Sequence, residues 1–126
     1  NLGNSAFSRC DRLETVTIGN GLSTIPLSAF RYCNKLTSVS FGTNVRIIRN
    51  YAFQNTNLAN VTLPNSLQAI HDYAFSNTPL STITLGDNVT TVASRSFSGC
   101  NNLAAINVAS ANIHFSSNNG ALFNKD

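Results

Sequence analysis

The chain has 126 residues, of which 42% are hydrophobic and only 10% are charged, whereas about 25% of the residues in a typical soluble domain are charged. This length predicts a single domain. The chain has no run of about 18 apolar residues, so the sequence predicts no membrane-spanning helix. The chain contains no methionine, and its first residue falls inside a sequence repeat described below, so we expect a processed protein or a piece of a longer one. The lack of a basic and then apolar signal segment at its start is therefore uninformative.

The formal net charge of +3 is unevenly distributed along the chain. Six of the eight basic residues fall within residues 1–50, namely Arg9, Arg12, Arg31, Lys35, Arg46 and Arg49. This basic end could meet an acidic glycan or an acidic partner. The alternative is scattered surface charge that keeps the protein in solution, because no run of like charges reaches the length of an interaction tail.

An Ala-Phe pair recurs at nearly constant spacing. The pairs are Ala6-Phe7, Ala29-Phe30, Ala52-Phe53 and Ala74-Phe75, with Ser96-Phe97 as the fifth copy. The phenylalanines follow one another at steps of 23, 23, 22 and 22 residues. Self-similarity at a period of about 20 to 30 residues predicts a solenoid built from stacked coils.

Each copy also contains the pattern L-x-x-V-x-L, which alternates like a half-buried strand. These segments are residues 13–18, 36–41, 58–63, 80–85 and 103–108. Gly or Pro follows in four copies and ends the strand. A second, shorter apolar segment such as 89–92 then crosses to the far side. We expect the short segment around each Ala-Phe pair to form a 3₁₀ or α turn.

A coil of about 23 residues cannot bury its own apolar side, so each coil must pack on its neighbours, with parallel strands about 4.8 Å apart. This requirement predicts one interior column of phenylalanines: Phe7, Phe30, Phe53, Phe75 and Phe97. The alanine beside each one is small, which favours a close approach of neighbouring coils there.

The repeat ends at Val108. Residues 1–108 are therefore predicted to hold five repeats, and residues 109–126 to form a boundary segment. Asn119-Gly120 lies between apolar residues, which is a strong hairpin signal. Such a hairpin would cover the open edge of the last coil.

These residues resemble the BspA-like leucine-rich repeat family of cell-surface proteins. The matching motif is I-x-x-x-A-F-x-x-C-x-x-L-x-x-I-x-L-P, and the five copies follow it with substitutions, such as Thr56 and Thr78 at the Cys position of the two shorter copies. The resemblance implies a right-handed leucine-rich-repeat stack with a concave parallel sheet and with short 3₁₀ or α turns, or short strands, on the convex side. It also implies a microbial surface or secreted protein that adheres to host matrix proteins such as fibronectin and fibrinogen, or to other microbes. The family brings no catalytic residues and no general ligand-contacting position.

The residues with chemical potential do not form an active site. Cys10, Cys33 and Cys100 occupy one repeat position without metal-ligand spacing, so they are interpreted as buried free thiols, with a Cys10–Cys33 disulfide left open. His71 and Asp72 are neighbours on a turn that we expect to face water, and no second base or nucleophile accompanies them. No phosphate-binding or dinucleotide-binding motif is present. The sequence thus predicts no enzyme, no metal, no cofactor and no nucleic-acid partner.

The outward side of the concave strands is the predicted binding site. Residues that flank the central apolar residue of each strand face outward and form rows of hydroxyl and amide groups, with basic and acidic residues at one end. The predicted site residues are Arg12, Glu14, Thr15, Thr17, Lys35, Ser38, Ser40, Asn60, Thr62, Thr82, Thr84 and Asn107. Tyr51 and Tyr73 share a column and form either edge packing or a ligand contact.

The main functional hypothesis is a non-enzymatic domain that binds an extracellular protein or a glycan, on a microbial surface or in a secreted protein. Two alternatives remain open. The rows of Ser and Thr could be good strand formers on a purely structural spacer that displays other domains. They could also order water, as the threonine rows of ice-binding solenoids do.

Overall fold

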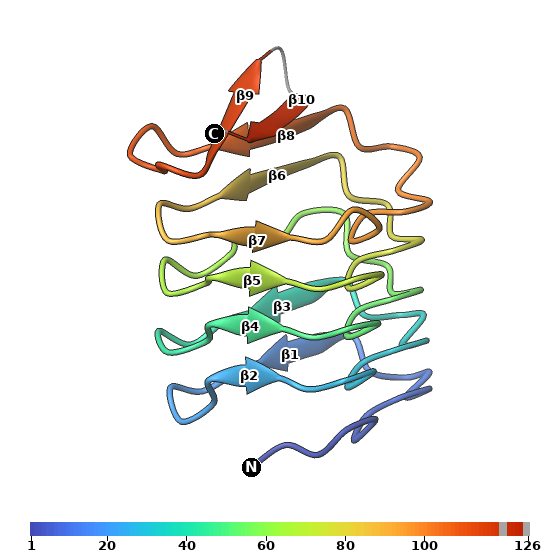
Figure 1. The fold of residues 1–126 in the computed structure, drawn as a ribbon. Helices are drawn as coiled ribbons and strands as arrows, with labels where there is room; N and C mark the ends of the chain where they lie inside the picture. The colour runs from blue at the N-terminus through green and yellow to red at the C-terminus, as the bar shows by residue number, and fades with distance from the viewer. Residues whose placement is uncertain (119–120, 125–126) are drawn as a thin grey trace.

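The computed structural model describes residues 1–118 and 121–124 of the chain as a stack of coils. Each regular coil passes through two short strands on opposite sides of a shared core, and the coils rise one above another from the N-terminus (Figure 1). The described residues form no helix, and so none that is long and apolar enough to cross a membrane. The predicted solenoid of parallel strands is confirmed.

The strands lie in two rows. The first row consists of β1 (Thr15–Thr17), β3 (Ser38–Ser40), β6 (Thr82–Leu85) and β8 (Ala105–Val108). The second row consists of β2 (Thr24–Ile25), β4 (Ile47–Ile48), β5 (Ala69–Ile70) and β7 (Thr91–Val92). Figure 1 shows the second row in front of the first. The second row is one continuous sheet, whereas the first row is divided into the pairs β1–β3 and β6–β8.

Neighbouring coils pair in parallel with equivalent residues opposite one another. Val16 pairs with Val39 in the first row, and Ile48 pairs with Ile70 in the second. A shift by one residue would turn every apolar side chain of a strand outward. The repeat length therefore sets the register, because each coil brings its apolar residues back to the same position around the core.

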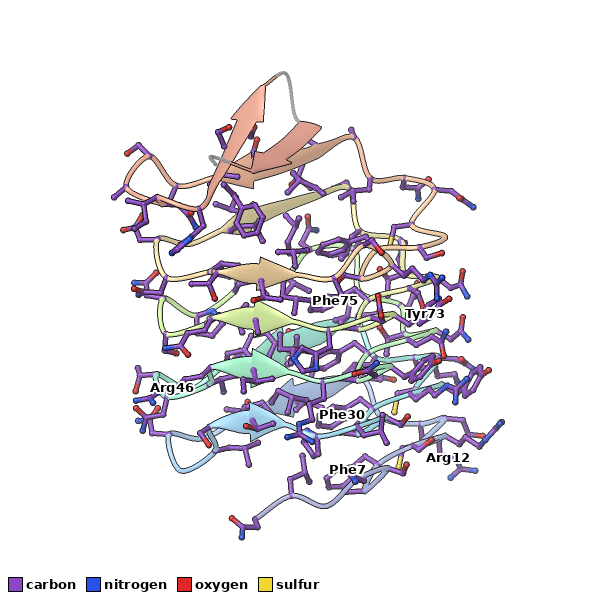
Figure 2. All side chains as sticks on the ribbon, viewed as in Figure 1. Phe7, Arg12, Phe30, Arg46, Tyr73 and Phe75 are labelled. Atoms are coloured by element: carbon purple, nitrogen blue, oxygen red, sulfur yellow. The ribbon has the colours of Figure 1, made fainter. Side chains whose placement is uncertain are left out.

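The five phenylalanines predicted to share a column form one interior stack, three of which are labelled in Figure 2. Neighbouring ring centres are between 5.3 and 5.8 Å apart, and neighbouring ring planes lie within 9° of parallel. Phe53 is fully buried, whereas Phe7 in the first coil is 43% exposed. Ala29, Ala52 and Ala74 are fully buried beside the rings, in line with the expected close approach.

The segment around each Ala-Phe pair forms consecutive turns, so the prediction of a 3₁₀ or α turn is wrong. The residue two positions after each phenylalanine has a positive φ in all five copies: Arg9, Tyr32, Asn55, Asn77 and Gly99. A second left-handed position precedes the pair at Ser5, Ser28, Tyr51 and Tyr73.

These left-handed residues direct alternate N–H groups toward the next coil. The Phe30 N–H donates to the Ala52 carbonyl at 2.8 Å, and the Tyr32 N–H donates to the Gln54 carbonyl at 2.9 Å. In a helix these donors would bond within their own coil. The turns therefore form a third ladder of hydrogen bonds between coils, which the repeat pattern does not predict.

The first strand row is interrupted at the third coil, contrary to the prediction of a strand in residues 58–63. The segment 60–63 lies between β3 and β6 without joining either. No hydrogen bond joins the backbone groups of residues 60–63 to any described residue. The third copy therefore leaves free backbone donors and acceptors in the middle of the row.

Pro64 accounts for this interruption. In the first two coils the equivalent residues are Gly19 and Gly42, and a Cβ at Gly42 would lie only 2.5 Å from the carbonyl oxygen of Gly19. The proline ring at this position is too bulky for the same approach and also lacks an N–H. The third coil therefore separates from the second on this side, while β4 and β5 still pair on the other side.

The C-terminal segment forms the predicted hairpin. The strands β9 (Phe115–Asn118) and β10 (Ala121–Asn124) pair in antiparallel fashion and lie against β8, whereas the predicted turn residues Asn119-Gly120 lie outside the described residues. Asn112 anchors the segment, because its Nδ2 donates to the carbonyls of Gly86 and Val89 at 2.8 and 3.0 Å. Phe115 is buried over the last coil.

Truncation of the central ring should remove much of the stability of the stack. We expect Phe53→Ala to lower the free energy of unfolding by about 3–5 kcal/mol, because the fully buried ring leaves a cavity between two others. Phe7→Ala should cost less than about 2 kcal/mol, because much of that ring is already in water. Urea unfolding of both variants measures the difference, and equal losses would contradict the stacking account.

The unpaired third coil should exchange its amide hydrogens faster than its neighbours. We expect residues 60–63 to exchange well before residues 82–85 of β6, because only the latter are hydrogen-bonded in a sheet. Pro64→Gly should slow exchange in residues 60–63, since glycine permits the close approach found at Gly42. Hydrogen–deuterium exchange with mass spectrometry tests both points, and equal protection of the two segments in the unmodified chain would refute the interruption.

Candidate functional site

The outward side of the first strand row, together with residues 60–63, is called the concave face below. Along β3 the alternation of the strand buries Val39 and turns Ser38 and Ser40 to solvent. The same alternation in β6 buries Ile83 and exposes Thr82 and Thr84. All twelve predicted site residues are exposed.

Pairing between coils brings the predicted polar residues into rows. Thr17 pairs with Ser40, and Thr84 pairs with Asn107. The row that contains Thr82 continues to Ala105, which is half-buried and carries no polar group. The concave face is therefore a surface of hydroxyl and amide groups that is uncharged along the strands.

The interruption of the row opens a hollow in this face. Its cavity volume is about 410 Å³, and Ser38, Ser40, Asn60 and Thr62 contribute to its wall. Phe41 and Leu63 also line it and are half-buried. The structure thus gathers four of the predicted residues around a recess that combines polar side chains, apolar surface and the free backbone groups of residues 60–63.

The predicted charged residues lie at the margin of the concave face. Arg12 and Lys35 each precede the first leucine of the strand motif in their coil, and both are exposed. Glu14 is also exposed, and its backbone carbonyl accepts a hydrogen bond from the Thr37 N–H. These charges therefore border one end of the polar rows and do not surround the hollow.

A continuous stack of arginine and tyrosine side chains runs along the turn edge of the solenoid. We call it the Arg–Tyr ridge, and it consists of Arg9, Tyr32, Arg31, Tyr51, Tyr73 and Arg95. The guanidinium carbons of Arg9 and Arg31 lie 4.5 and 4.9 Å from the ring centre of Tyr32. Tyr51 and Tyr73 are parallel, with ring centres 5.2 Å apart.

The sequence pattern predicts only the Tyr51–Tyr73 part of this ridge. Arg31 connects the coils, because its guanidinium lies 4.7 Å from the ring centre of Tyr51 and its Nε donates to Gln54 Oε1 at 2.6 Å. Gln54 Nε2 in turn donates to the Ser76 hydroxyl at 2.8 Å. The six ridge residues occupy three different positions of the repeat, so no single column of the repeat contains all of them.

The three cysteines are free thiols; Cys33 is buried as predicted, whereas Cys10 and Cys100 are only half-buried. The Cys33 thiol donates to the Phe7 carbonyl, and the Cys100 thiol donates to the Phe75 carbonyl, both at 3.0 Å. Burial raises the pKa of the Cys33 thiol, while a hydrogen bond from the Cys10 backbone opposes this shift. In the shorter coils the Thr56 hydroxyl bonds instead within its own coil, to the Phe53 carbonyl at 2.9 Å.

The neighbouring residues His71 and Asp72 lie on a turn, and Asp72 connects this turn to the next coil. His71 and Asp72 are half-buried, and Asp72 Oδ1 accepts the backbone N–H of Arg95 at 3.3 Å. Their predicted exposure to water is therefore only partial. Within residues 1–118 and 121–124, no three His, Cys, Asp or Glu side chains gather as metal ligands could.

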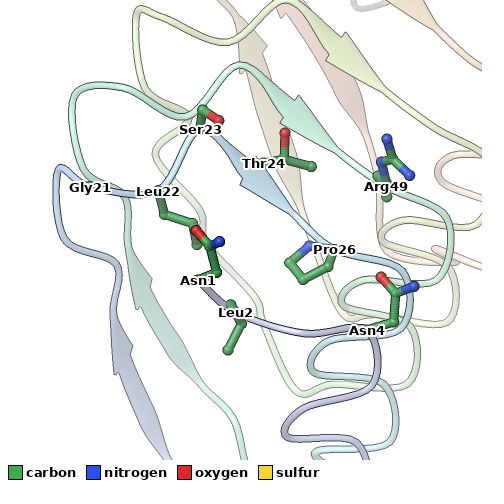
Figure 3. Close-up of a pocket in the computed structure, with 9 residues that line it drawn as sticks. All are labelled: Asn1, Leu2, Asn4, Gly21, Leu22, Ser23, Thr24, Pro26 and Arg49. Carbon is green, nitrogen blue, oxygen red and sulfur yellow. The ribbon is translucent and has the colours of Figure 1, made fainter.

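A second hollow lies beside the first residues of the chain, with a cavity volume of about 220 Å³. Figure 3 shows Arg49 and Asn4 on one side of it, and Leu22 and Asn1 on the other. It contains none of the twelve predicted site residues. It is thus separate from the concave face.

Comparison with known proteins places these features in a family. The family model for the BspA type leucine-rich repeat region matches residues 1–123 in six copies, which extends past the five complete copies counted in residues 1–108. Among curated proteins, none matches the chain. Leucine-rich repeats of this kind are normally non-enzymatic and generally serve as protein-interaction modules.

Solved bacterial structures share the fold. A leucine-rich repeat protein from Eubacterium ventriosum is 29% identical with a TM-score of 0.92, covering 98% of this chain and 33% of that one. A leucine rich cell surface protein from Faecalibacterium prausnitzii is 26% identical with a TM-score of 0.58, covering 97% of this chain and 26% of that one. The pneumococcal vaccine antigen PcpA is 27% identical with a TM-score of 0.52, covering 90% of this chain and 24% of that one.

The chain thus spans about a third of the first of these structures and about a quarter of the other two. The similarity covers nearly the whole of this chain in all three comparisons. With the family model matched over residues 1–123, the chain belongs to the BspA type leucine-rich repeat family.

Proposed function

We propose that the chain is the binding part of a bacterial surface or secreted protein and that it holds an extracellular protein or a glycan on its concave face, without catalysis. The observation that carries this proposal is the hollow between β3 and residues 60–63, where exposed Ser, Thr and Asn side chains meet free backbone groups. Repeat solenoids commonly bind on such extended surfaces.

The chemistry of the hollow suits a polar, uncharged part of a partner. Asn60 can both donate and accept through its amide, and the hydroxyls of Ser40 and Thr62 can do the same. Phe41 and Leu63 add apolar surface at the same place. Arg12 and Lys35 at the margin would attract an acidic neighbour of the contact and accelerate association.

The surface location is proposed from the relatives. One similar structure is named a cell surface protein and another a vaccine antigen. A domain displayed outside a bacterium meets host matrix proteins, host glycans and other microbes. Adhesion is therefore the role that we propose for binding at the concave face.

A structural spacer is the second candidate. The observation that favours it is the regular pairing of β-branched and hydroxyl residues, such as Thr17 with Ser40, which stabilises a strand row without any ligand. A spacer needs no hollow, however, and would lose nothing if the third strand were paired like the others. Water ordering by the threonine rows is disfavoured, because the interrupted row gives no continuous lattice.

A concave-face variant tests the proposal. We expect the combined changes Ser40→Glu, Asn60→Glu, Thr62→Glu and Thr84→Glu to reduce binding to immobilised fibronectin, fibrinogen or a glycan array at least about ten-fold, equivalent to about 1.4 kcal/mol, because bulky anions fill the hollow. Surface plasmon resonance measures the protein partners, and circular dichroism checks that the variant folds.

The matched control places the same four charges elsewhere. Ser23→Glu, Gln68→Glu, Thr91→Glu and Ser94→Glu alter exposed residues on or beside the second strand row, and they should leave binding unchanged. Equal losses in both variants would contradict the assignment to the concave face. If the unmodified chain recovers no partner from any of these probes, the spacer is the better account.

A further inference from the structure

The Arg–Tyr ridge has properties that packing of the coils does not require. It lies on the turn edge, where the backbone ladder and the phenylalanine stack already join the coils. Figure 2 shows Tyr73 and Arg12 on one edge of the molecule and Arg46 on the opposite edge. None of the ridge residues lines the concave hollow, so the chemistry of the ridge can be considered separately.

The guanidinium groups of the ridge lie over tyrosine rings. Arg9 and Arg31 both contact the ring of Tyr32, and Arg95 lies 5.9 Å from the ring centre of Tyr73. A guanidinium that stacks on an aromatic ring keeps its N–H donors free in its own plane. Arg31 already donates its Nε hydrogen to Gln54 and an Nη2 hydrogen to the Tyr32 hydroxyl at 3.5 Å. Stacking thus orients these groups in advance and lowers the entropy cost of a later contact.

The positive charges of the ridge are not neutralised by carboxylates. Among residues 1–118 and 121–124, no Arg or Lys forms an ion pair with an Asp or Glu. Arg9 and Arg31 share one tyrosine neighbour, so their guanidinium carbons are at most about 9 Å apart, close to the Debye length of about 8 Å at physiological salt, and their repulsion is only partly screened. Asp11 and Glu14 are exposed in the same part of the chain, yet neither pairs with them. An external anion would relieve this repulsion.

The order of charged and hydroxyl groups along the ridge indicates which ligand chemistry would match it. Arg9 and Arg31 provide cations in the first two coils, Tyr51 and Tyr73 provide two hydroxyl groups in the next two, and Arg95 provides a cation in the fifth. The tyrosine faces are occupied by one another and by arginine, so they offer no surface for an apolar side chain. A matching ligand is linear and carries anions and hydroxyl groups along its length.

We propose that the Arg–Tyr ridge binds an acidic polysaccharide, a linear sugar chain with sulfate or carboxylate groups on successive units. Arginine recognises either anion through paired N–H donors. The sugar hydroxyls pair with the tyrosine hydroxyls between the cations. An acidic peptide supplies the anions on flexible side chains but lacks the regular hydroxyl groups, so it is the poorer match.

The test measures binding of the whole chain to three probes by biolayer interferometry at several salt concentrations. Heparin carries sulfates, polygalacturonate carries carboxylates only, and poly-glutamate represents an acidic peptide. We expect one or both polysaccharides to bind, and poly-glutamate to bind at least about ten-fold more weakly at the same charge concentration, equivalent to about 1.4 kcal/mol. Comparison of heparin with polygalacturonate identifies which anion the ridge prefers.

Variants with matched charge locate the binding. Arg9→Gln with Arg95→Gln should lower polysaccharide affinity about ten-fold and reduce the slope of log affinity against log salt by about 2, one for each lost ionic contact. Arg46→Gln with Arg49→Gln removes the same charge from exposed residues beside β4. That control should change the affinity less than about two-fold.

Two further variants separate the ridge from general charge and from folding. Arg31→Lys keeps the positive charge but loses the planar donors, so it should weaken binding while unfolding remains cooperative. Tyr51→Phe with Tyr73→Phe keeps the ring stack and should weaken polysaccharide binding without changing the salt slope.

Four results would overturn the proposal: no polysaccharide binding, equal losses in the two arginine pairs, poly-glutamate binding as tightly as the polysaccharides, or a loss of polysaccharide binding in the concave-face variant that is larger than the loss in its matched control with the same four added glutamates. The last result would move the site to the concave face. Because the two surfaces share no residue, failure of the ridge leaves the proposed function of the concave face intact, and the converse also holds.

Discussion

The whole structure depends on burial of apolar surface between coils, because one coil has no second layer of its own to cover its apolar side. Phe30, Phe53 and Phe75 are buried only because rings from the coils below and above cover their faces. Phe7 has a neighbour on one side and is 43% exposed. At the other end, the β9–β10 hairpin lies against β8, and Phe115 supplies the buried ring.

Three ladders of hydrogen bonds hold the coils at equal spacing, and their differences determine where function can lie. The second strand row and the turn edge are continuous through the coils, so they carry the architecture. The first row is broken at the third coil, where Pro64 prevents the close approach. This break costs hydrogen bonds but opens a polar recess, and the other two ladders keep the coils together around it. The turn edge, in contrast, presents side chains oriented by stacking.

The sequence predicts the parts of this structure that repeat. The spacing of Phe53 and its equivalents defines the core column, and the alternation of Ser38, Val39 and Ser40 defines the outward rows. The left-handed turns were not predicted because arginine and tyrosine, found in this column at Arg9 and Tyr32, rarely adopt a positive φ. Asn55, Asn77 and Gly99 in the same column are of the residue types that favour it. The interruption at residues 60–63 depends on the contact of Pro64 with a neighbouring coil, and the ridge combines residues from three repeat positions, so neither follows from a single-copy pattern.

The most direct measurement of the central claim is the folding of one coil alone. A synthetic peptide of residues 70–92, which spans one full repeat and contains the strands β6 and β7, can be compared with the whole chain by far-ultraviolet circular dichroism and hydrogen exchange. The account predicts a peptide without strand signal or protected amides, beside a whole chain with both. A peptide that showed the strand signal and protection of the whole chain would contradict the dependence of each coil on its neighbours.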